Sequence, residues 1–311
     1  MHELPMAALR SIFGARLQEN VPLAHYTTAR VGGPADAMVP VNSAEELART
    51  AEQVWELGIP YFVIGGGSNI LVSDHGVHEL VILNRTRNIR IDTKSSPPSA
   101  WAESGANLGS LARQTALRGM SGLEWAASIP GTVGGAVYGN SGANGGDMAG
   151  SLILAEILHP QLGRNWWPVE QMSYQYRNST LKLNKSKAII LSARLKLVQS
   201  TPEAVQAKIE TLSERRRNTQ PPGASMGSMF KNPSGDYAGR LIDSVGLKGH
   251  SIGGAEISPL HANFFVNRGT ASAADIWNLI RLAREKVAEK TGVDLEMEIE
   301  RIGDWENGFH A

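Results

Sequence analysis

Cysteine is absent from this chain of 311 residues, which excludes disulfide bonds, thiolate metal sites and cysteine nucleophiles. An excess of one charge is also absent, because Lys+Arg and Asp+Glu each count 30 and the formal net charge is zero. Without a global field, we expect neither nucleic acid nor a membrane as a partner, and local groups must hold any anionic ligand. Long apolar runs are missing too, since runs such as residues 188–191 are far shorter than a bilayer span.

The N-terminal segment, residues 1–23, lacks the continuous apolar core of a secretion signal. Glu3, Arg10, Arg16 and Glu19 interrupt it, and the pattern predicts an amphipathic helix. We therefore expect a soluble, cytoplasmic protein. The chain is too long for one small core and fits two or three domains.

Hydrophobic periodicity predicts both helices and strands. Residues 43–46 have the spacing of a capping box and open a helical stripe that stops at Gly58. Further helical periodicity is found at residues 108–118, 202–217 and 273–290. Strand-like patterns are found at residues 59–64, 70–72, 81–83, 101–103, in short stretches of 151–199 and, half-buried, at 293–302.

Two breaks in composition indicate domain boundaries. Residues 94–99 are polar and proline-rich, which is typical of a surface loop before a strand. Pro202 suits the first turn of a helix, and we place the start of the last domain near residue 200. The predicted domains are residues 1–95, 96–200 and 201–311.

Glycine is abundant, at 33 residues, and much of it lies in two clusters, of which the first is residues 65–69. These glycines follow one strand and lead into another, whereas a Rossmann fingerprint or a P-loop needs glycines that open a helix. A tight turn is the plain interpretation. Ser68 and Asn69 favour a second one, because a run of N–H groups with short polar side chains can form an anion-binding nest.

The second glycine cluster lies within residues 123–147, which are too rich in glycine to predict an ordinary helix. A flexible linker is the plain alternative. However, a solvated linker would not need the apolar residues Ile129, Val133, Val137 and Tyr138. We therefore expect backbone that closely approaches a large ligand.

Seven motifs follow one another in an order that is hard to produce by chance. They are YTTARVGGP (26–34), GGGSN (65–69), IPGTVGGA (129–136), YRNS (176–179), GSMFKNP (227–233), GLKG (246–249) and LEME (295–298). Over nearly the whole chain they resemble the UDP-N-acetylenolpyruvoylglucosamine reductase (UDP-N-acetylmuramate dehydrogenase) family, in its shorter second type.

The resemblance implies an α+β protein with a vanillyl-alcohol-oxidase-type (PCMH-type) FAD-binding fold. The first two predicted domains would be its FAD-binding subdomains, and the third an α+β substrate domain for the sugar nucleotide. FAD would be bound without a covalent bond. The residues implied to hold it are Gly65, Gly66, Gly67, Ser68, Asn69, Ile129, Pro130, Gly131, Thr132, Gly134 and Gly135.

The resemblance also implies the reaction. An NADP-dependent flavoprotein oxidoreductase would use NADPH and FAD to reduce UDP-N-acetylglucosamine enolpyruvate to UDP-N-acetylmuramate. This step belongs to peptidoglycan synthesis, and hence to cell wall biogenesis, cell shape and cell division. The implied catalytic residues are Arg177, which stabilises an enol-like intermediate, Ser228, which donates a proton, and Glu298, which assists both. The implied substrate-binding residues are Tyr176, Lys231, Asn232 and Arg240.

Each catalytic candidate also has a plainer interpretation. Arg177 resembles a surface arginine with a packed stem, and Ser228 resembles a turn residue. Glu298 would share one face of a strand with Asp294, Glu296 and Glu300, which is typical of a solvated face. The histidines have no metal-ligand spacing, so we predict no metal site.

Two other functions stay open on the sequence. A flavin-dependent oxidase of the same fold would react with oxygen and would lack the motifs of Ser228 and Glu298. A non-catalytic nucleotide-binding module would need the glycine loops alone. We expect a monomer whose partners are the UDP-sugar and NADPH.

Overall fold

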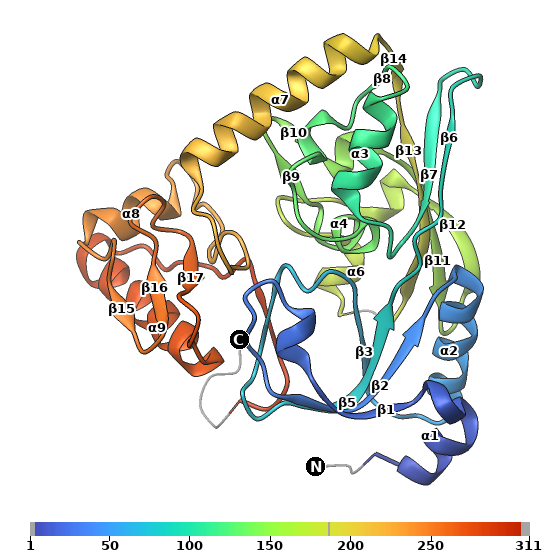
Figure 1. Ribbon diagram of the computed structural model, residues 1–311, viewed down its shortest axis with the longest axis horizontal. Coiled ribbons are helices and arrows are strands. Elements are labelled where there is room, and N and C mark those ends of the chain that lie inside the picture. Colours follow the sequence, from blue (N-terminus) through green and yellow to red (C-terminus); the bar gives the residue numbers. More distant parts are fainter. Residues whose placement is uncertain (1–3, 186, 306–311) are drawn as a thin grey trace. The chain divides into compact units, whose positions relative to one another are not determined.

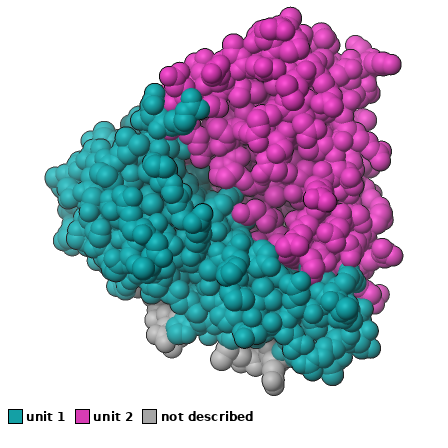
Figure 2. Space-filling model, in the orientation of Figure 1, with its two compact units in different colours: residues 1–39, 67–81, 217–311 teal, residues 40–66, 82–216 magenta. Residues whose placement is uncertain are grey.

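The computed structural model describes residues 4–185 and 187–305. The chain forms two compact units (Figure 2). Unit 1 consists of residues 1–39, 67–81 and 217–311, and unit 2 of residues 40–66 and 82–216. Both units contain helices and strands, as the sequence predicts. Among the described residues, no helix combines the length and the apolar character that a membrane span requires.

Unit 2 contains an antiparallel five-stranded sheet in the order β12-β11-β13-β7-β6. Its strands are β12 (Gly163–Pro168), β11 (Leu152–His159), β13 (Ile189–Lys196), β7 (Ser99–Glu103) and β6 (Ile89–Asp92). The helix α4 (Val133–Gly139) packs against β13 and β7 (Figure 1). Together with α3 (Leu108–Ala116) it buries a core of small and aliphatic side chains on one face of the sheet.

A second sheet has the strand order β1-β2-β5-β3. Its strands are β1 (Gln18–Pro22), β2 (Pro34–Val41), β5 (Val77–Asn84) and β3 (Tyr61–Ile64). Between β2 and β3 lies α2 (Ala44–Glu56), where the predicted cap is confirmed: the Ser43 side chain accepts from Glu46 N. Glu46 Oε2 accepts in turn from Asn42 N at 2.8 Å, so the helix start is closed from both directions.

Unit 1 is built around α9 (Ala273–Thr291), which packs against α8 (Ala238–Ser244) and a small antiparallel sheet. The strands of this sheet are β15 (Ser251–Ile252), β16 (Ala255–Ile257) and β17 (Phe265–Asn267). A capping box of Ser272 and Asp275 starts α9, and Gly292 ends it with φ +72°. Both ends of this predicted helix are therefore confirmed. Beyond it, β18 (Glu300–Ile302) pairs in parallel with β4 (Ile70–Val72).

Most other predicted elements are confirmed with small changes of length, but the strand predicted at residues 81–83 is part of the longer β5. The predicted helix from Pro202 is α7 (Pro202–Thr219), and the polar loop before residue 99 is irregular, although a strand, β6, precedes it. Short elements complete the fold: α5 (Met148–Ser151), α6 (Thr180–Leu183), β8 (Met120–Ser121), β9 (Gly142–Ala143), β10 (Gly146–Asp147) and β14 (Val198–Gln199).

Two predicted elements are wrong in extent. The N-terminal helix α1 spans only Met6–Phe13, because Gly14 leaves the helical region with φ +51° and residues 18–22 pair with β2 instead. The first three residues of that prediction lie outside the described part of the chain. The predicted strand at 293–302 is regular only in β18; the residues before it are irregular, although their backbone still bonds to a neighbouring segment.

The second glycine cluster corrects a further expectation, because Val133–Gly139 forms the helix α4 despite its three glycines. Val133 N donates to Ala106 O at 2.9 Å and Gly134 N donates to Ser104 O at 2.7 Å. Val133 and Val137 are fully buried. Tertiary packing and these partners therefore outweigh the poor helix propensity of glycine.

Candidate active site

The first glycine loop, residues 65–69, connects β3 directly to β4, as predicted. At Gly65 an added Cβ would lie 2.5 Å from Thr132 Oγ1, and at Gly66 it would lie 3.0 Å from Gly131 Cα. These two glycines therefore let the first loop lie directly against the second glycine segment. Gly67 has φ +57°, and a Cβ there would collide with the carbonyl oxygen of Tyr26.

The second segment presents its glycines differently. Gly134 faces the protein, where an added Cβ would lie 2.8 Å from Ser104 Cβ. Gly135 is exposed, and the nearest atom to an added Cβ is Thr132 Oγ1 at 3.6 Å. The N–H groups of Val133 and Gly134 are already bound to carbonyls, so they cannot hold a phosphate.

Unused backbone donors remain where the two loops meet. Within the described part of the chain, the N–H groups of Gly65, Gly66 and Gly131 donate to no protein acceptor. A cluster of such donors with no Cβ in the way suits an anion, because it can approach the backbone closely. The arrangement fits the pyrophosphate of FAD. The other predicted FAD residues lie on the same two loops: Ser68, Asn69, Ile129 and Thr132 are half-buried, and Pro130 is exposed.

Arg177 lies in unit 2 in a tight turn whose ends, Gln175 and Asn178, exchange backbone hydrogen bonds of 3.1 Å. Its φ is +58°, a left-handed backbone that few arginines adopt. The Nη2 group donates to Gly142 O at 2.9 Å, and the guanidinium carbon lies 5.2 Å from the Tyr176 ring centroid. The half-buried guanidinium is thus fixed against the glycine-rich segment, unlike a free surface side chain.

Buried polar contacts hold the same turn from both sides. Asn140 Nδ2 donates to Gln175 O at 2.9 Å, and Ser179 Oγ donates to Tyr138 O at 2.6 Å. Tyr174 donates its hydroxyl to Val137 O at 2.8 Å. Burial raises the pKa of Tyr174 far above its usual range, and the charge of Asp147 raises it further. The hydroxyl therefore stays neutral and acts as a structural donor.

The sequence reasoning missed Asn140 as a residue that supports the site. Its backbone is left-handed, with φ +47°, and it caps the C-terminus of α4. Its Oδ1 accepts from Ala149 N at 2.9 Å, so one amide ties together three parts of the chain. Asparagine is enriched in left-handed backbone, but the sequence did not predict the helix that Asn140 ends, so its role as a C-cap gave no signal.

Ser228 and Glu298 lie together in unit 1 on neighbouring backbone segments. Glu298 N donates to Met229 O at 2.8 Å, and Lys231 N donates to Glu296 O at 2.8 Å. Both catalytic candidates are half-buried. Of the four acidic residues expected on one face, Asp294 and Glu296 are exposed, whereas Glu298 and Glu300 are partly buried. Glu298 is therefore not part of a uniformly solvated face.

Asn69 links the first glycine loop to Glu298. Its Nδ2 donates to Glu298 O at 3.1 Å, and its own carbonyl accepts from Glu300 N at 3.0 Å. Asn69, the last residue of the predicted FAD loop, therefore fixes the backbone at Glu298. This contact joins residues that are 229 positions apart in the chain.

The predicted substrate-binding residues have different surroundings. Tyr176 is 52% exposed. Lys231 is 8% exposed and pairs with Glu296 at 2.5 Å, and Asn232 Oδ1 accepts from Ala238 N at the start of α8. Arg240 is exposed and forms a two-bonded ion pair with Asp236. The Arg240 guanidinium and Tyr237 N lower the pKa of Asp236 to about 2.

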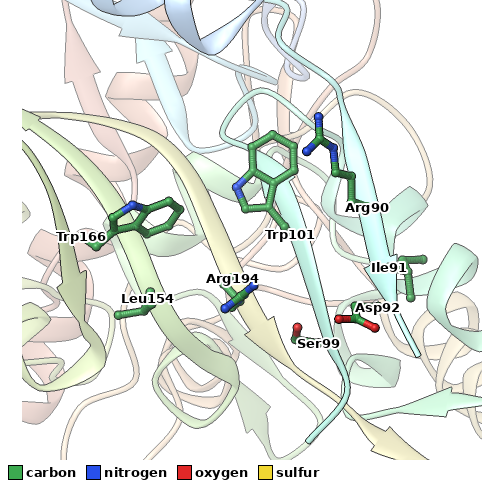
Figure 3. A pocket seen from close by; sticks show the side chains of 8 residues that line it. All are labelled: Arg90, Ile91, Asp92, Ser99, Trp101, Leu154, Trp166 and Arg194. Atoms are coloured by element: carbon green, nitrogen blue, oxygen red, sulfur yellow. The ribbon is translucent and has the colours of Figure 1, made fainter. Parts of the chain in front are cut away.

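A cavity of about 490 Å³ lies on the other face of the five-stranded sheet in unit 2 (Figure 3). It is lined by Arg90, Ile91, Asp92, Ser99, Trp101, Leu154, Trp166 and Arg194. The Arg90 guanidinium carbon lies 5.2 Å from the Trp101 ring centroid, and Trp101 Nε1 donates to Ser192 Oγ at 3.0 Å. None of the predicted site residues lines this cavity.

Two protein-family models match segments of the chain. Residues 219–302 match the C-terminal domain of UDP-N-acetylenolpyruvoylglucosamine reductase. Residues 35–155 match an FAD binding domain. The second match contains both glycine loops, and the first contains Ser228 and Glu298.

Comparison with individual proteins covers nearly the whole chain. UDP-N-acetylenolpyruvoylglucosamine reductase of Chloroflexus aggregans is 41% identical over 289 residues, which are 92% of this chain and 97% of that protein. The enzyme of Bacillus subtilis is 39% identical over 285 residues, or 91% and 93% of the two chains. The crystal structure of the Thermus caldophilus reductase superimposes with a TM-score of 0.78 at 38% identity, covering 92% and 99%.

Proposed function

The chain belongs to the UDP-N-acetylenolpyruvoylglucosamine reductase family, and from this premise we propose that Arg177, Ser228 and Glu298 carry out its reaction. Membership makes the protein a cytoplasmic oxidoreductase of peptidoglycan precursor synthesis that uses FAD and NADPH. The predicted PCMH-type fold with a substrate domain is confirmed, and the chain's length agrees with the shorter second type.

Ser228 is the proposed proton donor. FAD, held by the two glycine loops, would supply the redox chemistry that links NADPH to hydride addition at C3 of the enolpyruvyl group. The substrate then holds an electron pair at C2, and the Ser228 hydroxyl donates its proton there. A weakly acidic hydroxyl is sufficient because the carbon that it protonates is far more basic than an ordinary leaving group.

The observation that carries this assignment is the hydrogen bond from Glu298 N to Met229 O. It places the Glu298 backbone directly beside the segment that carries Ser228. Glu298 is therefore in a position to assist protonation of the substrate, in line with its partly buried surroundings.

Arg177 is proposed to stabilise the negative charge that develops on the substrate carboxylate as the hydride arrives. Its hydrogen bond to Gly142 O and its contact with the Tyr176 ring hold the guanidinium before substrate binds. A charge that is fixed in advance is an efficient electrostatic catalyst, because it needs no reorganisation during the reaction. The planar fork of a guanidinium suits the geometry of a carboxylate.

FAD is proposed to bind through the two glycine loops without a covalent bond. The N–H groups of Gly65, Gly66 and Gly131 would hold its pyrophosphate, and exposed Gly135 would allow close approach of the ligand. The remaining loop residues are proposed to shape the same site: Gly67, Ser68, Asn69, Ile129, Pro130, Thr132 and Gly134. Gly134 would act through packing, since its N–H is bound to Ser104 O.

We propose that Tyr176, Lys231, Asn232 and Arg240 contact the UDP-sugar. Lys231 and Arg240 have the charge that a pyrophosphate requires, although each has a carboxylate partner that substrate must displace or share. We further propose that the protein is a monomer without nucleic-acid or membrane partners. We also propose that the chain consists of three domains, with boundaries after residues 95 and 200. Zero formal net charge supports the absence of polyanionic partners.

The colour of the purified holoenzyme tests the function. NADPH should bleach the yellow flavin under anaerobic conditions, and UDP-N-acetylglucosamine enolpyruvate should restore the colour. Acid precipitation should release the FAD into the supernatant. Recovery of colour with oxygen but not with the sugar nucleotide would favour an oxidase, and the absence of bleaching would favour a non-catalytic module.

A further inference from the structure

Asn263 lies just before β17 and is 3% exposed. Its side chain binds both backbone groups of one residue: Oδ1 accepts from Phe230 N at 3.0 Å, and Nδ2 donates to Phe230 O at 2.8 Å. Its own carbonyl accepts from Met229 N at 2.9 Å. Three of the hydrogen bonds that hold residues 229–230 therefore involve this single asparagine.

The side-chain amide of Asn263 replaces a strand partner. In a regular ladder, a neighbouring strand would bond the N–H and C=O of Phe230; here one planar amide does so. The next residue on that edge, Phe264, forms an isolated bridge with Ser228. On the other edge, Met229 O and Lys231 N bond to residues 298 and 296. The segment that carries Ser228 is thus held from both edges.

The backbone of Asn263 is itself fixed. Asn263 N donates to His261 Nδ1 at 3.2 Å, and the His261 ring packs against Phe264 with centroids 4.8 Å apart. Burial lowers the pKa of His261, which keeps the ring neutral and Nδ1 able to accept. Because the Asn263 backbone is fixed, its side-chain amide also has a defined position, and this position determines where the backbone of Phe230 lies.

We propose that Asn263 is a positioning residue for Ser228. By bonding both backbone groups of Phe230, it keeps the Ser228 hydroxyl within reach of C2 of the substrate during protonation. The proposal rests on the proton-donor role of Ser228 given above. Misplacement of a reacting group by about 1 Å can cost roughly 100-fold in rate, so a backbone clamp of this kind has a measurable effect.

The test compares two half-reactions in the FAD-loaded protein. Stopped-flow absorbance measures flavin reduction by NADPH and flavin reoxidation by UDP-N-acetylglucosamine enolpyruvate in Asn263→Ala and Asn263→Asp. Asn263→Asp keeps size and one acceptor but loses the donor to Phe230 O. Asn267→Ala is the matched control, because Asn267 also bonds backbone groups in unit 1, including Ala29 O at 2.9 Å. Rate constants report only loaded molecules, so partial unfolding does not obscure them.

We expect Asn263→Ala to slow reoxidation by roughly 10- to 100-fold and to leave reduction by NADPH nearly unchanged. Asn263→Asp should have a smaller effect, and Asn267→Ala should spare both half-reactions. The solvent deuterium isotope effect on reoxidation should rise in Asn263→Ala, because proton donation becomes slower. Amide hydrogen exchange of a peptide spanning residues 227–231 should accelerate in the same variant.

Two results would overturn the proposal. Equal slowing of both half-reactions would assign Asn263 a general structural role, and unchanged reoxidation with accelerated exchange would show that the clamp does not govern the reaction. Ser228→Ala, measured alongside, separates this proposal from its premise. If Ser228→Ala slows reoxidation but the Asn263 variants do not, the clamp fails while the function stands. If Ser228→Ala has no effect, the premise fails.

Discussion

The Arg177 turn in unit 2 and the Ser228 segment in unit 1 are both supported by a buried asparagine, but in different ways. Asn140 forms one hydrogen bond to the Arg177 turn, from its Nδ2 to Gln175 O, and its Oδ1 accepts from Ala149 N outside the turn. Asn263 gives both of its groups to one residue, Phe230. The Arg177 turn is therefore held by single hydrogen bonds from several residues, among them Ser179 to Tyr138 O and Tyr174 to Val137 O, whereas one asparagine fixes both backbone groups of Phe230.

This difference suits the two proposed tasks. A guanidinium that stabilises charge acts through a field that falls off gradually with distance, so single hydrogen bonds spread over the turn hold it well enough. A hydroxyl that donates a proton must lie within hydrogen-bond reach of one carbon. The segment with the stricter geometric task has the more complete set of backbone partners.

The largest expected effect concerns Ser228. Ser228→Ala should slow flavin reoxidation by the sugar substrate by roughly 10²–10⁴-fold, because a positioned general acid is lost. Reduction by NADPH should stay nearly intact, and Ser228→Cys should recover part of the rate because a thiol can also donate. Stopped-flow absorbance of each half-reaction measures this. Equal slowing of both would mean that Ser228 shapes the flavin site, and its proton-donor role would be withdrawn.

Arg177 should give a somewhat smaller loss. Arg177→Gln removes the charge but keeps an N–H donor, and we expect reoxidation to slow by roughly 10²–10³-fold. Arg177→Lys keeps the charge without the planar fork and should retain part of the rate. Steady-state kinetics with NADPH and the sugar nucleotide measures both variants. Full activity in Arg177→Gln would contradict the catalytic role and would favour the plainer interpretation of Arg177 as a packed surface residue.

The adjacent glycines Gly134 and Gly135 in α4 separate two effects: Gly134 packs against the protein, whereas Gly135 is exposed and is proposed to contact FAD. Gly134→Ala should lower the free energy of unfolding by about 1–3 kcal/mol, because its Cβ would crowd Ser104. Gly135→Ala has room and should leave stability intact or raised, yet weaken FAD binding about tenfold, or ~1.4 kcal/mol. Thermal melts and FAD titrations of the apoprotein measure the two effects. Unchanged FAD affinity in Gly135→Ala would place FAD away from this glycine.

The smallest expected effect concerns the pair of Arg240 and Asp236. The folded-state pKa of Asp236, about 2, lies below its ordinary value, so the pair stabilises the fold above that ordinary value. The contribution is lost as pH falls toward 2. Because Arg240 is exposed and Asp236 only partly buried, Arg240→Ala should hardly change the melting temperature but should raise the pKa of Asp236, as NMR titration can show. A raised KM for the sugar nucleotide at unchanged kcat would support the proposed contact; an unchanged KM would remove Arg240 from the substrate site.

Much of the fold could be predicted from short stretches of sequence. The cap at Ser43, the capping box and Gly292 around α9, and the strands that flank the first glycine loop all depend on residues close together in the chain. Such signals are local, because a capping side chain bonds backbone only two or three residues away. The order of the motifs was likewise sufficient to identify the family.

Only the tertiary structure decided how the site is supported. Val133–Gly139 became a helix because carbonyls of residues 104 and 106 accept its first N–H groups. Phe230 is hydrogen-bonded to Asn263, 33 positions away in the chain, and Asn69 to Glu298, 229 positions away. The periodicity of the sequence does not predict such partners, since the side chain of either asparagine could equally have bonded to water or to backbone close to it in the chain. The sequence by itself therefore determined the elements and the chemical groups, and long-range hydrogen bonds, which form only when the chain is packed, decided which groups stand side by side.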